Sequence, residues 1–344
     1  MQRILALCGL WMLICLAAGC AEPVSREPGD AEEAAPVERQ GDWLGEQPPT
    51  ARARLFAPGI VSTGLYERDL AIHPDGEEIY WSVVLGSFDS AAVLRVRRGS
   101  DGVWSEPEVA PFSGRYRDLE PMFDPAGERL YFVSNRPLPG NSEAQDHSDI
   151  WYVERAGEDW GEPQRLPGPV NSDAPEFFPS FTRDGTLYLT RDEPDGRSRI
   201  YRAAREGEGW AEPQPLGAKI NGHRTQFNGL IDPDERFLIF SAFGREDSLG
   251  GVDYYVAPRN PDGTFGEAVN LGPAVNSKSR DEYAPGLSPD GKYLFFMSSR
   301  SRYQTLPGQP RSREDLLTSD GQPENGRPDV YWIPVSAVPA LENF

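Results

Sequence analysis

Side chains that carry oxygen recur at one position of this 344-residue chain, nine residues before the turn residue of each of five similar segments. Four of them are carboxylic acids and one is an amide. The five residues are Glu67, Asp118, Glu176, Gln226 and Glu282. Hard cations such as calcium prefer carboxylate and amide oxygens. If the five side chains meet on one axis, we expect them to hold a ligand or a cation there, with calcium as the default candidate.

The five segments each predict a β-hairpin. They read IHPDGEEIYWSVV, FDPAGERLYFVSN, FTRDGTLYLTRD, IDPDERFLIFSAF and LSPDGKYLFFMSS, and they begin at Ile72, Phe123, Phe181, Ile231 and Leu287. In each, a strand-like run meets a turn of the Pro-Asp-Gly type, in which Pro presets φ and Gly accepts a positive φ, and a second strand follows. The second motif lacks the turn Asp and the fourth lacks the turn Gly. We expect both turns to persist with altered geometry.

Two further strands follow each hairpin. The third begins at Ala91, Asp149, Arg199, Asp253 and Asp329. The fourth recurs as VWSEPEV, DWGEPQRL, GWAEPQPL and TFGEAVNL, and the last unit lacks it. Four strands that repeat at intervals of roughly 50 to 60 residues predict an all-β fold in which each repeat is one blade of a β-propeller.

The ends of the chain predict how the ring of blades closes. Residues 54–60 parallel the stretch before the third hairpin, with Leu55 matching Leu166 and Ile60 matching Val170. We therefore expect this N-terminal strand to pair with residues 330–335, which completes the last blade and removes an exposed edge. The count is then five blades. A six-bladed propeller is the alternative, although no residues remain to build a sixth blade.

With these motifs the chain resembles the WD40-like Pro-Asp repeat propellers of the TolB type, over about residues 51 to 338. The resemblance implies a propeller, commonly six-bladed in that family. It implies little about activity, because propellers host unrelated functions. In a propeller the first strand of each blade lines the central channel. We therefore expect the five repeated oxygen-bearing residues to form a ring near one channel mouth.

Two interpretations of that ring remain open. Converging carboxylates repel one another unless a cation, arginines or water offset their charge, which predicts a ligand or calcium. Alternatively, each acid bonds the backbone of a neighbouring blade as a structural residue of the repeat, and we favour this alternative. The residues two positions further along are not uniform, which marks a place where the blades could have diverged for a ligand. They are Asp69, Glu120, Phe178, Asn228 and Ala284. Arg68 and Arg117 lie beside ring residues and are expected to pair with the acids.

The N-terminus predicts a lipoprotein. An apolar run from Ile4 to Ala18 is too short to span a bilayer comfortably, and it leads into Leu-Ala-Ala-Gly-Cys, which resembles a bacterial lipobox ending at Cys20. We predict a signal peptide over residues 1–19, a lipid on Cys20, a disordered acidic and Pro-rich tether over residues 20–50, and a propeller domain over residues 51–344. The predicted location is the periplasmic side of the outer membrane.

Composition limits the function. With 34 Lys and Arg against 54 Asp and Glu, the formal charge is −20, which argues against a nucleic-acid partner. The three histidines lack zinc-ligand spacing, and familiar catalytic motifs are absent. We predict a monomeric, non-catalytic module without a cofactor, unless calcium occupies the ring, that binds a protein or a peptidoglycan-associated partner. The alternative is a glycan-active hydrolase that uses acids at the channel mouth. The long loop from Ser301 to Pro328 is either a recognition loop or a disordered insertion.

Overall fold

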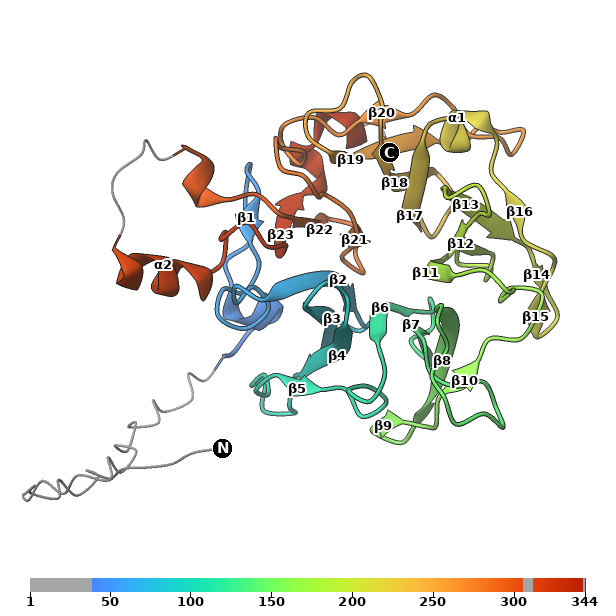
Figure 1. Ribbon diagram of the computed structural model, residues 1–344, viewed down its shortest axis with the longest axis horizontal. Coiled ribbons are helices and arrows are strands. Elements are labelled where there is room, and N and C mark those ends of the chain that lie inside the picture. The colour runs from blue at the N-terminus through green and yellow to red at the C-terminus, as the bar shows by residue number, and fades with distance from the viewer. Residues whose placement is uncertain (1–38, 306–311, 343) are drawn as a thin grey trace, which may run out of the picture. The chain divides into compact units, whose positions relative to one another are not determined.

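The computed structural model describes residues 39–305, 312–342 and 344, which belong to one compact unit, residues 38–344. Within it, five four-stranded antiparallel sheets surround a common axis as a five-bladed β-propeller (Figure 1). The predicted all-β fold and the five blades are confirmed, and the described residues form no sixth blade. Cys20, the predicted signal peptide and most of the predicted tether lie outside the described residues.

The strands follow the chain from blade to blade, each blade running outward from the axis. Blade 1 contains β2 (Tyr66–Ile72), β3 (Glu78–Leu85), β4 (Ser90–Arg97) and β5 (Glu108–Val109). Blade 2 contains β6 (Asp118–Phe123), β7 (Arg129–Ser134), β8 (Asp149–Ala156) and β10 (Gln164–Arg165), with β9 (Asp159–Trp160) paired to β8. Blade 3 contains β11 (Glu176–Phe181), β12 (Leu187–Asp192), β13 (Ser198–Ala203) and β16 (Gln214–Pro215).

Blade 4 contains β17 (Thr225–Ile231), β18 (Phe237–Phe243), β19 (Val252–Pro258) and β20 (Val269–Asn270). Blade 5 contains β21 (Gly286–Leu287), β22 (Tyr293–Ser298), β23 (Asp329–Pro334) and β1 (Arg54–Leu55). A small hairpin outside the blades consists of β14 (Arg205–Glu206) and β15 (Gly209–Trp210). The short helices are η1 (Asp42–Gly45), α1 (Ala218–Asn221), η2 (Arg302–Thr305), α2 (Arg313–Asp320), η3 (Val335–Ala337) and η4 (Pro339–Leu341).

Each inner hairpin closes through the same turn. The turn residue has φ between 56° and 83° and donates its N–H to the carbonyl oxygen three residues earlier, at 2.8–3.0 Å. These turn residues are Gly76, Gly127, Gly185, Glu235 and Gly291. The turns at Gly127 and Glu235 therefore persist as predicted, but the expected change of geometry was wrong. Glu235 accepts hydrogen bonds from the Tyr188 hydroxyl at 2.6 Å and the Arg202 guanidinium at 3.0 Å. These contacts offset the cost of a positive φ in a residue other than glycine.

The N-terminal strand closes the ring. β1 pairs antiparallel with β23, with Leu55 opposite Tyr331, and the N–H of Phe56 donates to the carbonyl oxygen of Val330 at 2.9 Å. This confirms the predicted closure, with a shorter strand than expected. The match of Leu55 to Leu166 was one residue out of register. Phe56 is the equivalent of Leu166, because Leu166 makes the same backbone bond to blade 2.

Recurring asparagines fix the segment between blades to the third strand of the blade before it. Asn171, Asn221 and Asn276 each accept a backbone N–H of that strand at 2.8–2.9 Å and donate to the carbonyl of the same residue at 2.9 Å. In this way each side-chain amide satisfies two backbone groups of that strand. Where the ring closes, Ser62 has the same role: its hydroxyl accepts the N–H of Val330 and donates to the carbonyl oxygen of Val330.

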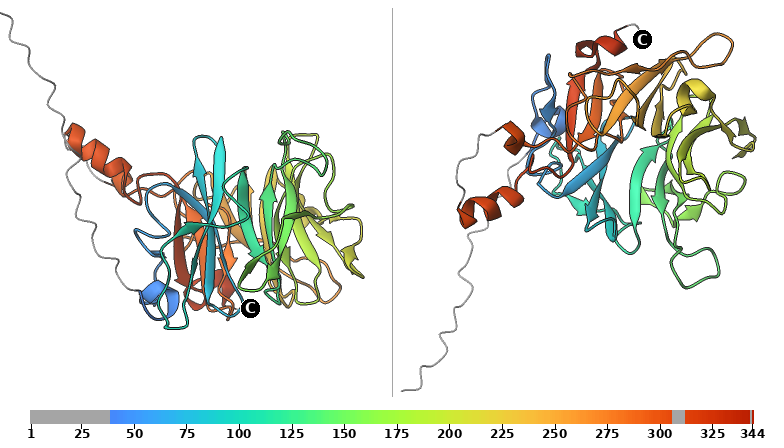
Figure 2. Two further views of the ribbon diagram at one scale, coloured as in Figure 1. Left: turned by 90° about the horizontal axis from the view of Figure 1, so that it is seen from below. Right: turned by 45° about the horizontal axis from the view of Figure 1, so that its top comes forward.

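Two described parts of the chain outside the blades have defined structure, residues 39–45 and α2. Residues 39–45 pack on the ring instead of belonging to the predicted tether: Leu44 is buried, and the Trp43 ring contacts Tyr293, Phe295 and Trp332. The tether prediction missed this because two apolar residues in a polar stretch gave no periodicity. In the long loop, α2 begins with a capping box at Ser312 and buries no side chain, and it lies to one side of the blades (Figure 2). Among the described residues, no helix has the length and apolar character needed to cross a membrane.

Candidate functional site

The five repeated oxygen-bearing residues are fully or almost fully buried between blades. Each acid accepts hydrogen bonds from the segment that enters from the preceding blade. Ser172 bonds Glu176 through its hydroxyl and its N–H, and Thr63 and Ser277 bond Glu67 and Glu282 in the same way. The Ser113 hydroxyl donates to Asp118 at 3.0 Å. These bonds fasten one blade to the next.

Arginines complete most of these networks. The ion pairs are Asp118 with Arg136 at 2.8 Å, Glu176 with Arg191 at 2.7 Å and Glu282 with Arg300 at 3.4 Å. In blade 4 the acid is replaced by Gln226, whose amide has no partner within the described chain. The described residues contain no cluster of three or more His, Cys, Asp or Glu suited to a metal ion. The structure thus places the five residues in separate networks, and it does not bring them together on the axis.

The positions two residues further along share an unusual backbone. Asp69, Glu120, Phe178, Asn228 and Ala284 all have φ between 51° and 60°. In blades 1 to 4 the pairing of the inner strand shifts register at this point. A bulge of this kind bends a strand and re-aims its side chains. A positive φ costs a residue with a side chain roughly 1–2 kcal/mol, so the surrounding contacts must hold these bulges in place.

Contacts between different blades show that these bulges surround the axis. Arg68 in blade 1 binds Asp69 at 2.6 Å and Glu120 in blade 2. Its guanidinium lies 4.7 Å from the ring of Tyr283, just before β21 in blade 5. Glu120 also accepts the N–H of Phe178 in blade 3 at 2.7 Å. We call Arg68, Asp69 and Glu120 the axial cluster. Arg68 does pair with acids, but these are Asp69 and Glu120 and not the ring residues.

Burial dominates the electrostatics of the axial cluster. It raises the pKa of Asp69 and of Glu120, and Arg68 opposes the shift in both. The proximity of Asp69 raises the pKa of Glu120 further. One Asp69 oxygen and both polar atoms of the Asn228 amide lack partners within the described chain. The cluster therefore holds two carboxylates around one guanidinium in a nearly water-free setting.

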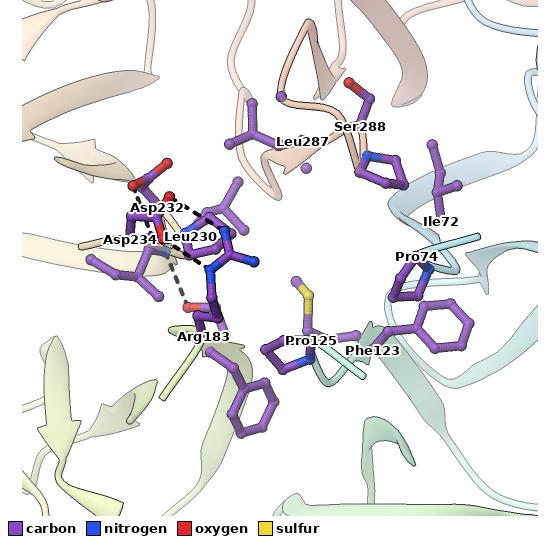
Figure 3. A pocket seen from close by; sticks show the side chains of 18 of the residues that line it. Ile72, Pro74, Phe123, Pro125, Arg183, Leu230, Asp232, Asp234, Leu287 and Ser288 are labelled. Carbon is purple, nitrogen blue, oxygen red and sulfur yellow. Dashed lines mark hydrogen bonds and ion pairs between the residues drawn. The ribbon is translucent and has the colours of Figure 1, made fainter. Parts of the chain in front are cut away.

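A cavity of about 520 Å³ lies on the same axis, on the side of the hairpin turns (Figure 3). All five blades line it. Leu70, Met122 and Leu230 lie one or two residues beyond the bulges, so the cavity is next to the axial cluster. Four turn prolines also line it, namely Pro74, Pro125, Pro233 and Pro289.

Charged side chains border the cavity. Arg183 pairs with Asp234 at 3.0 Å, and Arg236 pairs with Asp232 at 2.6 Å. Figure 3 shows Arg183 and Asp234 joined beside the opening. Sequence reasoning did not single out these residues. A signal was present, because Arg183 occupies the position at which the other four hairpins have proline.

Comparisons with known proteins add little to this geometry. No family model and no curated protein sequence matches the chain. Solved structures similar to it include TolB from Acinetobacter baumannii (16% identity, TM-score 0.45, covering 78% of this chain and 54% of that one). A putative TolB from Agrobacterium tumefaciens has 14% identity and a TM-score of 0.45, covering 78% of this chain and 90% of that one. An alpha-L-arabinofuranosidase from Lactobacillus brevis has 15% identity and a TM-score of 0.45, covering 80% of this chain and 92% of that one. This chain spans about half the length of the Acinetobacter protein. At these values the likenesses carry no argument about function. The class that the structure itself defines is a five-bladed β-propeller with an axial cavity.

Proposed function

We propose that this protein is a non-catalytic binding module that holds a segment of a protein or cell-envelope partner in its axial cavity. The observation that carries the proposal is the cavity itself, about 520 Å³ in volume and lined by all five blades. Binding pockets usually span about 300–1,000 Å³ and combine apolar walls with a few polar groups. Walls of proline and leucine beside ion-paired arginines fit that description.

The lining also indicates the chemistry of the partner. Its apolar walls suit an apolar side chain. The charged residues that line the cavity are four aspartates and two arginines, so negative charge exceeds positive charge there. They are Asp124, Asp232, Asp234, Asp290, Arg183 and Arg236. The whole chain carries a formal charge of −20. Complementary charge favours a partner segment that combines basic and apolar residues.

The test is a charge reversal at the cavity. The full chain with Asp234→Lys and Asp290→Lys is expected to lose at least tenfold in affinity for the envelope proteins that the parent chain captures. The matched control is Glu143→Lys with Glu246→Lys, two exposed acids on the loops at the other end of the blades. That variant is expected to capture them normally. Equal capture by all three chains would show that the cavity is not the binding site.

We also propose that a lipid on Cys20 tethers the propeller to the periplasmic side of the outer membrane. The support is the lipobox-like sequence that ends at Cys20. Replacing Cys20 by Ser is expected to move the protein from the membrane fraction to the soluble fraction of fractionated cells. A variant that remained with the membranes would contradict the anchor.

A hydrolase acting on glycans is the second candidate, and one observation favours it. Asp69 and Glu120 lie on neighbouring blades near the axis, and burial raises the pKa of both, as a general acid requires. Their burial and their shared pairing with Arg68 weigh against it. Release of sugars from envelope glycans by the parent chain, but not by the Glu120→Gln chain, would favour the hydrolase over the non-catalytic module.

A further inference from the structure

The seam where the ring closes differs from the other seams between blades. Glu67 of blade 1 donates its N–H to the carbonyl oxygen of Pro328 at 3.0 Å, which sets it beside Asp329 of blade 5. Both side chains are fully buried. One oxygen of each carboxylate, Oε2 of Glu67 and Oδ1 of Asp329, has no hydrogen-bond partner within the described chain. Two carboxyl groups therefore lie side by side between blades 5 and 1, away from solvent.

The seam between blades 2 and 3 is a matched comparison. There Glu176 donates its N–H to the carbonyl oxygen of Ser148 at 3.0 Å, which sets it beside Asp149 in the same way. Each acid has its own arginine. Arg191 pairs with Glu176 at 2.7 Å, and Arg165 pairs with Asp149 at 2.6 Å. Oδ1 of Asp149 also lacks a hydrogen-bond partner within the described chain, so the seams differ in their arginines: here two guanidinium groups balance the two buried acids.

Strand register identifies the residues of the closing seam that stand at the positions of Arg191 and Arg165. Arg191 lies opposite Glu176 in the β11–β12 pair, and Val83 lies opposite Glu67 in the β2–β3 pair. Arg165 lies opposite the residue two beyond Asp149, and Leu55 lies opposite the residue two beyond Asp329. Apolar side chains thus occupy both arginine positions.

Few other groups offset the burial of these two carboxyl groups. Glu67 is bonded by Thr63, and Asp329 accepts the N–H of Glu324 at 2.6 Å. Among charged neighbours, the carboxylates of Glu67 and Glu324 raise the pKa of Asp329, and Arg302 lowers it. Arg327, nearby in the chain, pairs with Asp320. Burial is the largest effect, and it raises the pKa of Glu67 and of Asp329 to about 7.

The same seam anchors the long loop that carries α2. Asn325 and Arg327 donate to the carbonyl oxygen of Gly64 at 2.9 and 3.0 Å. The hydrogen bond from Glu324 to Asp329 adds a third tie. A change in charge on Glu67 and Asp329 therefore acts at the root of this loop. Further along the loop, the α2 residues Leu316 and Leu317 are exposed.

We propose that Glu67 and Asp329 form a pH-sensitive fastening between blades 5 and 1. It holds residues 324–328, the C-terminal root of the long loop, in place while the pair keeps a proton, and it releases them when both acids are ionised. The folded state retains protons that the unfolded chain loses above its ordinary carboxyl pKa. Stability is therefore highest below that range, falls as pH rises toward about 7, and stays low above it.

The melting temperature of the full chain tests the proposal between pH 5 and 9. The parent is expected to lose several degrees between pH 5 and 8. Glu67→Gln and Asp329→Asn are each expected to melt higher than the parent at pH 8 and to depend less on pH. The control Glu176→Gln is expected to melt lower at both pH values, because it leaves Arg191 without a carboxylate.

Hydrogen exchange of residues 313–329 gives a second readout. Protection is expected to fall between pH 6 and 8 in the parent and to stay constant in Leu55→Arg, which supplies the guanidinium that Arg165 supplies in the matched seam. The proposal is overturned if Glu67→Gln and Asp329→Asn keep the pH dependence of the parent. It is also overturned if calcium raises the melting temperature of the parent at pH 8 and leaves both variants unchanged, since the pair would then bind a metal.

Discussion

Replacing Phe56 by Ala is expected to lower the free energy of unfolding by about 3–5 kcal/mol, the usual cost of truncating a buried aromatic residue. Phe56 is fully buried, and its ring meets those of Phe295 and Trp332 edge-on, with centroids 5.0 and 5.2 Å apart. It follows β1 directly, so the N-terminal segment closes blade 5 with this side chain as well as with its backbone bonds. Denaturant titration of the purified protein measures the effect.

The matched control is Val109→Ala. Val109 belongs to β5, the outermost strand of blade 1, as β1 is the outermost strand of blade 5. Its side chain is exposed, so its removal is expected to cost no more than about 0.5 kcal/mol. Deletion of residues 51–62 should cost more than Phe56→Ala, because it also leaves β23 unpaired. Similar stabilities for Phe56→Ala and Val109→Ala would contradict closure through the N-terminal segment.

The sequence predicted the fold well because the hairpin signal is local. Pro presets one turn dihedral and Gly accepts another, so five copies of the motif predict five hairpins without any knowledge of packing. The chain ends then predicted the closure. The Glu235 turn was misjudged because its geometry depends on bonds from Tyr188 and Arg202, which lie about 30 to 50 residues away in the sequence.

The site was harder to predict, because alternation along a strand does not reveal bulges. Counting from the turn located Glu67 and its equivalents correctly in sequence, but not which way their side chains face. A register shift in the inner strand turns the next repeated position toward the axis. The residues of the second set, which begins with Asp69 and Glu120, differ from blade to blade in the sequence, and this variation is the better indicator of the axis. A residue that is the same in several blades makes a contact that recurs at several seams, as Glu176 and Glu282 do. A contact at the axis, such as that of Arg68 with Glu120, is made only by the blades that carry those residues.

Replacing Arg68 by Met is expected to destabilise the protein by about 3–5 kcal/mol at pH 7, because it leaves Asp69 and Glu120 buried without their cation. Methionine keeps most of the side-chain volume, so the loss reports charge more than packing. Arg68 opposes the effect of burial, so its removal raises the pKa of both carboxyl groups further. The folded state then retains protons that the unfolded chain releases, and stability falls as pH rises above the ordinary carboxyl range.

The destabilisation by Arg68→Met is therefore expected to shrink as pH is lowered from 7 to 5, which denaturant titration at the two pH values measures. The matched control is the triple variant Arg68→Met, Asp69→Asn, Glu120→Gln, which removes all three charges and is expected to recover much of the stability at pH 7. If the single variant lost equal stability at both pH values and the triple variant recovered none, Arg68 would act by packing against Tyr283, 4.7 Å from its guanidinium, and the axial cluster would not be an electrostatic unit.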